Sequence, residues 1–174
     1  MEHRSAPRGS EVSSLPRQKV FGPDTFVMAL LVATAACNRP APPVPVPNGA
    51  ALSQKIVAPY LNADEALAAD RTDGIKANAA DISAAARAIG PPAAGIDRAA
   101  VQLASAASLE DARTKFGAMS LAIEAYMTDQ HLAPPAGVRM AFCPMVMKPW
   151  LQKDGKIRNP YYGSQMLTCG SFKH

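Results

Sequence analysis

The sequence predicts an all-α protein, an antiparallel bundle of about four helices, followed by an irregular C-terminal tail that contains short β segments. Hydrophobic residues fill 48% of the 174 positions but aromatic residues only 6%. Much of the apolar content is alanine, and such small side chains suit closely packed helices better than a β-sandwich. Between residues 51 and 132 the apolar positions recur at intervals of three and four, and short breaks separate the stripes. Short helices joined by short loops form an antiparallel bundle.

Each expected helix carries one apolar stripe. The stripes are Leu52, Ile56, Tyr60, Ala63 and Leu67; Ile75, Ala79, Ile82, Ala86 and Ile89; Ile96, Ala100, Leu103 and Ala107; and Leu109, Ala112, Phe116, Met119, Ile123 and Tyr126. Ser108 is the expected N-cap of the last helix, because acidic residues follow it in the first turn. Pro59 removes a backbone hydrogen bond within the first stripe, so we expect that helix to kink or restart there.

The tail after the last helix differs in composition. Residues 138 to 143 alternate like a short strand, and Val138, Met140 and Phe142 form the face expected to pack on the bundle. Turn signals at Asp154-Gly155, at Asn159-Pro160 and at Gly163 make the rest of the tail irregular. Trp150 is expected to fill the space between tail and bundle.

The N-terminal residues predict export. A basic segment, an apolar run over 25–36 and small residues before Cys37 are typical of a signal peptide over residues 1–36. Thr34-Ala35-Ala36-Cys37 resembles a bacterial lipobox, so Cys37 is the expected lipidation site. Five prolines between Pro40 and Pro47 predict a semi-rigid tether over residues 37–49, before a folded domain at 50–174. The expected location is the periplasmic side of a bacterial membrane, through the lipid anchor, or the soluble periplasm without it.

Charge and motifs exclude several classes of function. Residues 55–129 hold seven basic and ten acidic side chains, while residues 138–174 hold six basic and one acidic, so the net charge of +4 arises in the tail and does not indicate nucleic-acid binding. The sequence contains no run of 18 apolar residues of the kind that predicts an ordinary membrane-spanning helix. The sequence has no C-x-x-C, no glycine-rich phosphate loop and no convincing nucleophile with a base, so we expect no enzyme activity.

Sulfur-containing side chains are concentrated in the tail. In an extended segment Cys143, Met145 and Met147 would lie on one side, and a turn would place Met166 beside Cys169. Thiolates and thioethers prefer Cu(I) or Ag(I) to hard cations. These five residues are therefore the expected ligands of a soft-metal site.

Other roles for these residues stay open. Cys143 and Cys169 in an exported domain could form a disulfide, with the methionines as core residues, and the disulfide and metal-bound states could interchange. Met119 and Met127 are expected in the core. His131 is expected to cap the last helix, the alternative being a ligand to a nearby site.

Four motifs in order carry a family resemblance: Cys143-Pro144-Met145, Trp150-Leu151, the segment 157–163 (IRNPYYG) and the segment 166–170 (MLTCG). Together they resemble the signature of the domain of unknown function 3347 family, exported domains found alone or attached to the periplasmic adaptor subunits of copper and silver efflux pumps. The resemblance implies an association with heavy metals, chiefly copper, and points to Cys143, Met145, Met166 and Cys169. The sequence departs from the family at residues 147–149, where Met147 is either an added ligand or a core residue.

Two functions follow from these patterns. The first is a periplasmic lipoprotein that binds Cu(I) or Ag(I), for buffering or for hand-over to an efflux system in heavy-metal resistance, with an efflux-pump adaptor or another envelope protein as partner. The alternative is a disulfide-stapled protein-interaction module without metal. In that module the turn at 159–163 would dock a partner.

Overall fold

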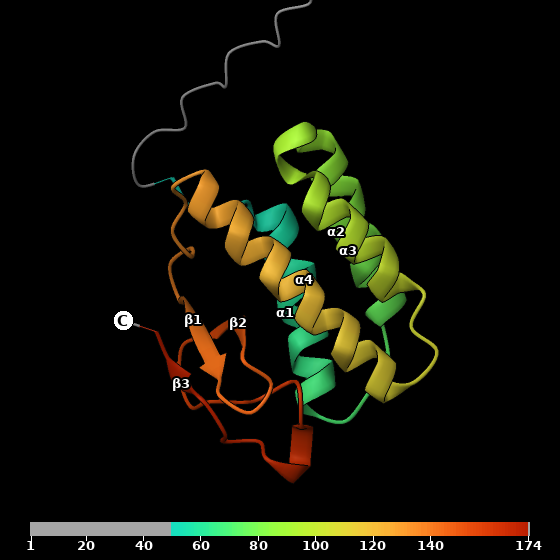
Figure 1. Cartoon of the computed structure of the whole chain (residues 1–174), viewed down its shortest axis with the longest axis vertical. Helices are drawn as coiled ribbons and strands as arrows, with labels where there is room; N and C mark the ends of the chain where they lie inside the picture. Colours follow the sequence, from blue (N-terminus) through green and yellow to red (C-terminus); the bar gives the residue numbers. More distant parts are fainter. Residues whose placement is uncertain (1–49, 174) are drawn as a thin grey trace, which may run out of the picture. The chain divides into compact units, whose positions relative to one another are not determined.

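Four helices form the larger part of the domain in the computed structural model, which describes residues 50–173. The predicted signal peptide, Cys37 and the tether lie outside the described residues. The helices are α1 (Gln54–Ala68), α2 (Ile75–Ile89), α3 (Ala94–Ala104) and α4 (Leu109–Asp129). Consecutive helices run in opposite directions and pack on their neighbours in the chain, as Figure 1 shows. The prediction of a bundle of about four helices is confirmed.

The C-terminal tail folds into a small antiparallel sheet. Strands β1 (Val138–Cys143) and β2 (Lys148–Lys153) form a hairpin, and β3 (Ser171–Phe172) pairs with the other edge of β1. The predicted β segments are thus confirmed, but the sheet contributes Trp150 and Leu151 to the same core as the helices. The all-α class therefore describes only residues 50–137.

The face of β1 that packs inward is opposite to the predicted one. Ala141 and Cys143 are fully buried, whereas Val138, Met140 and Phe142 are only half-buried. Ala141 lies opposite Trp150 in the hairpin, and its small side chain leaves room for the indole. Side-chain size, rather than hydrophobicity alone, decides which face of this strand points inward.

Tyr60 joins the sheet to two helices. Its side chain is fully buried in α1, and its hydroxyl bonds with the Ser120 hydroxyl in α4, at 2.7 Å. The same hydroxyl accepts a hydrogen bond of 3.2 Å from the backbone N–H of Leu151 in β2. The Tyr60 and Phe116 rings lie 4.8 Å apart. α1, α4 and β2 therefore meet at a satisfied polar group inside the core.

The ends and the interior of the helices test three further expectations. Ser108 caps α4 as predicted, because its hydroxyl accepts from the backbone N–H of Asp111 at 3.1 Å. The prediction of a restart at Pro59 is wrong, because α1 continues through this buried residue; the predicted kink stays a prediction. Met119 and Met127 are buried in the core as expected.

His131 ends α4 through its backbone. It has φ of +53°, its N–H bonds with the Thr128 carbonyl at 3.2 Å, and the next N–H, of Leu132, bonds with the Met127 carbonyl at 2.8 Å. This pair of hydrogen bonds satisfies the last carbonyls of the helix. The expected capping by the imidazole is therefore replaced by capping through the main chain.

Arg113 of α4 connects the loop after β2 to the helices through hydrogen bonds and an ion pair. Its guanidinium donates to the Leu67 carbonyl at 3.0 Å and to the Pro160 carbonyl at 3.1 Å, and it forms an ion pair with Asp70. Hydrogen bonds from Ser164 and from Arg113 lower the pKa of Asp70. Asp70 thus connects the end of α1 to the short helix at Gly163–Gln165.

Gly163→Ala tests this connection. Gly163 has φ of +54°, and an added Cβ would lie 2.0 Å from the Asp70 carboxylate and 2.1 Å from the Arg113 guanidinium. We expect a loss of about 2–4 kcal/mol in the free energy of unfolding, measured by urea denaturation.

Gly95→Ala in α3 is the matched control, because an added Cβ there meets nothing within 4 Å. It should change stability by about 0.5 kcal/mol or less. Equal stability of the two variants would contradict the proposed role of the Asp70–Arg113 pair.

Candidate metal centre

The buried amide of Asn159 lies between the two cysteines of the described chain. Its Nδ2 donates to the Cys143 Sγ at 3.2 Å and to the Cys169 carbonyl at 2.7 Å. Asn159 and Cys143 are fully buried, and Cys169 is half-buried. Both thiols are free. Two cysteines that are 26 positions apart in the sequence thus meet at one side-chain amide.

Three further hydrogen bonds fix the orientation of Asn159. Its Oδ1 accepts from the Tyr161 N–H at 2.8 Å, in the manner of an Asx turn. Its own N–H donates to the Leu167 carbonyl at 2.7 Å, and its carbonyl accepts from the Gly163 N–H at 3.0 Å. The amide is therefore held in place by its own turn and by the segment that leads to Cys169.

The environment of Cys169 keeps its thiol protonated. Burial, together with the neighbouring Cys143 thiol, raises the pKa of Cys169. A thiol with a raised pKa is a poor nucleophile at neutral pH but becomes a ligand when a metal ion displaces its proton. Metal binding and thiol–disulfide exchange at Cys169 both require the loss of this proton.

Met166 and Cys169 are brought together by a turn, as the spacing predicts. The Cys169 N–H donates to the Met166 carbonyl at 3.0 Å. Met166 is 37% exposed and Cys169 is half-buried, so the turn joins a methionine at the surface to the half-buried cysteine. This placement makes Met166 the methionine best suited to complete a site with the two cysteines.

Met145 and Met147 are placed differently from the prediction. Residues 144–147 are not extended but reverse the chain, because Cys143 pairs with Lys148 across the β1–β2 hairpin. Met147 has φ of +53°, and the Met145 and Met147 side chains are 60% and 68% exposed, while Cys143 is buried. The expectation that all three side chains share one side is therefore wrong.

The turn at 159–163, the predicted docking loop of the alternative function, is largely buried. Asn159, Pro160, Tyr161 and Gly163 are all buried, and only Tyr162 is half-exposed. The Tyr161 hydroxyl donates to the Pro149 carbonyl, and the ring lies edge-on to Trp150 at 5.9 Å. This segment supports the core and the cysteines, and it offers little surface to a partner.

The sequence analysis did not single out Asn159 as part of the site. The sequence did indicate a turn here, since an asparagine before a proline favours an Asx turn. The contacts of Asn159 with Cys143 and Cys169, however, depend on the fold. Within residues 50–173, no three His, Cys, Asp or Glu side chains gather as a metal-binding group. A site here would therefore rest on two thiols and a thioether.

No family model, curated protein or solved structure matches this chain. The resemblance to the domain of unknown function 3347 family consequently stays a prediction from the four motifs. None of the helices in the described part, residues 50–173, has the length and hydrophobicity to cross a membrane.

Asn159→Ala tests the support of the site. The substitution would leave the N–H of Tyr161 and the carbonyl of Cys169 without their side-chain partners, and buried groups in that state are costly. We expect a loss of about 2–4 kcal/mol in the free energy of unfolding under reducing conditions.

Asn62→Ala, at an exposed position in α1, is the control and should change stability by about 0.5 kcal/mol or less. If Asn159→Ala were no more destabilised than this control, the buried amide would not hold the tail together.

Proposed function

We propose that this protein is a lipoprotein on the periplasmic side of a bacterial membrane that binds one Cu(I) or Ag(I) ion through Cys143 and Cys169. The observation that carries the proposal is that Asn159 joins the free thiol of Cys143 to the backbone of Cys169, whose own free thiol neighbours Cys143. Thiolates are soft ligands and favour these monovalent ions over Mg²⁺ or Ca²⁺. The ion would be buffered or handed to an efflux system, in keeping with the family that the tail resembles.

The donor set explains a preference among metals. Two thiolates carry two negative charges, and one monovalent ion leaves a single net negative charge in a half-buried site. The Nδ2 donor of Asn159 at 3.2 Å from the Cys143 sulfur offsets part of this charge. Met166 adds a neutral soft ligand from the surface side, without further charge to desolvate.

The disulfide alternative uses the same two sulfur atoms. A Cys143–Cys169 disulfide would leave no thiolate for a metal, so the oxidised and metal-bound states exclude each other. The buried turn at 159–163 argues against a docking role for that segment. The metal site is therefore the function better supported by these contacts.

Substitution of each sulfur ligand should separate the two functions. In competition with a coloured Cu(I) chelator, we expect Cys143→Ser and Cys169→Ser to weaken binding by about a hundredfold or more, because a thiolate is lost. Met166→Leu should weaken it by about tenfold. Met145→Leu and Met147→Leu, the matched controls, should bind like the wild type because their side chains point to solvent.

Equal Cu(I) affinity of the wild type and both serine variants would contradict the metal site and favour the stapled module. The pH dependence gives a second readout. Since a metal displaces protons from the thiols and the pKa of Cys169 is raised, affinity should increase with pH across the neutral range. A pH-independent affinity would mean that thioethers alone bind the ion.

Membrane attachment is tested at Cys37. If this residue carries the lipid, Cys37→Ser should move the protein from the membrane fraction to the soluble fraction, since no other anchor is expected. Fractionation with immunodetection measures this. A wild-type protein already in the soluble fraction would show that Cys37 is not lipidated.

A further inference from the structure

Asp64 of α1 is a buried carboxyl without a protein partner. The residue is 3% exposed, and its Oδ1 is the one buried side-chain oxygen or nitrogen of residues 50–173 that lacks a hydrogen bond. Burial raises the pKa of Asp64 well above its usual value, with a further rise from Glu65 that Arg158 and Lys153 oppose. An unsatisfied buried carboxyl costs stability, and such a group calls for a function.

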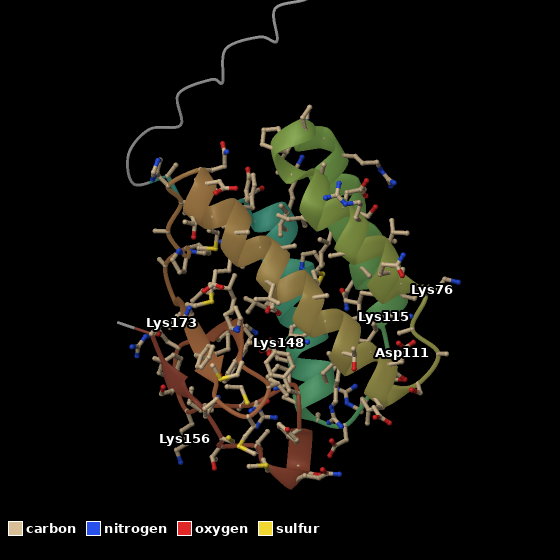
Figure 2. The ribbon with its side chains drawn as sticks, viewed as in Figure 1. Lys76, Asp111, Lys115, Lys148, Lys156 and Lys173 are labelled. Carbon is tan, nitrogen blue, oxygen red and sulfur yellow. The ribbon has the colours of Figure 1, made fainter. Side chains whose placement is uncertain are left out.

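Asp64 lines a pocket of about 440 Å³. The walls come from the end of α1, the end of β2, the loop at 156–158 and the segment 167–168. This volume lies within the range of small-molecule sites. Figure 2 shows Lys156 of this wall in the lower part of the view. The wall includes neither Cys143 nor Cys169, although Leu167 and Thr168 directly precede Cys169 in the chain.

Some of the charged side chains around the pocket form ion pairs, and others do not. Lys153 pairs with Glu65 at 2.6 Å, and Asp154 lies 3.9 Å from Arg139. Gln152 also lines the pocket, and its side-chain amide forms hydrogen bonds with backbone groups and with the Trp150 indole.

Two basic side chains in the pocket wall remain without an ion-pair partner in the described part of the chain. Lys156 and Arg158 form no ion pair with any side chain in the described part of the chain. Ile157 and Leu167 supply apolar surface between them. The groups that remain for a ligand are thus two cations, one carboxyl and an apolar wall.

We propose that this pocket binds a small organic carboxylate, whose oxygens accept from the Asp64 carboxyl and pair with Arg158 and Lys156. The alkyl part of the ligand lies against Ile157 and Leu167. A protonated Asp64 donates a hydrogen bond to the carboxylate, which gives the orphaned group its partner. A cationic amine is disfavoured, because the two basic side chains of the wall that form no ion pair within residues 50–173, Lys156 and Arg158, would repel it.

Butyrate is the probe, with butylamine and 1-butanol as ligands of the same chain length but different head groups. We expect butyrate to cause saturable amide shifts at residues 152–158 and 167–168 in nuclear magnetic resonance spectra of the full chain, at constant ionic strength. The dissociation constant should be in the range of about 1 mM, as befits so small a ligand. Butylamine and 1-butanol should cause none.

Substitutions at Arg158 and Asp64 test the assigned contacts. Arg158→Gln should weaken butyrate binding by about tenfold, while Lys76→Gln, on α2 away from the pocket, should not. Asp64→Leu should abolish binding and raise the melting temperature of the ligand-free protein, because it removes the unpartnered carboxyl. Asp64→Asn keeps a donor at the same place and should retain binding.

Three results would overturn the proposal: no saturable binding of butyrate, binding of butylamine in its place, or equal butyrate affinity of Arg158→Gln and Lys76→Gln. The Arg158 and Lys76 variants lie at exposed positions, so their comparison remains decisive if Asp64→Leu fails to fold.

Discussion

The hydrogen bonds of Asn159 are the constraint on which the C-terminal tail of this domain depends. The chain after β2 has little regular secondary structure, so its buried polar groups need partners that no helix or long strand supplies. Asn159 provides them by joining its own turn, the segment that leads to Cys169 and the thiol of Cys143. The hairpin places Cys143, and Asn159 holds the backbone of Cys169 beside it.

The helices hold the tail and its two cysteines in place through contacts from α1 and α4. Tyr60 and Arg113 reach from α1 and α4 to the tail, one through a buried hydroxyl and the other through backbone carbonyls and Asp70. Lys148, at the start of β2, lies with its stem against Gly117 of α4. The tail is thus fixed to the bundle at several points, and the thiols sit on a rigid base.

Periodicity in the sequence was sufficient to predict the helices, because each apolar stripe has one face to bury. It was insufficient for β1, where Ala141 and not Met140 faces inward because Trp150 needs the space. The turn at residues 144–147 was missed because Met147 adopts a left-handed conformation that carries no glycine signal. For the site, the sequence predicted the cysteines but not Asn159, whose contacts join residues distant in the chain.

Copper K-edge absorption spectroscopy of the reduced, Cu(I)-loaded protein identifies the atoms bound to the metal. We expect a monovalent ion with sulfur neighbours alone, two of them from thiolates. A shell of nitrogen or oxygen neighbours would contradict the metal site, and so would a spectrum unchanged by Cys143→Ser and Cys169→Ser together. Either result would mean that the contacts of Asn159 with Cys143 and Cys169 serve the fold rather than a metal.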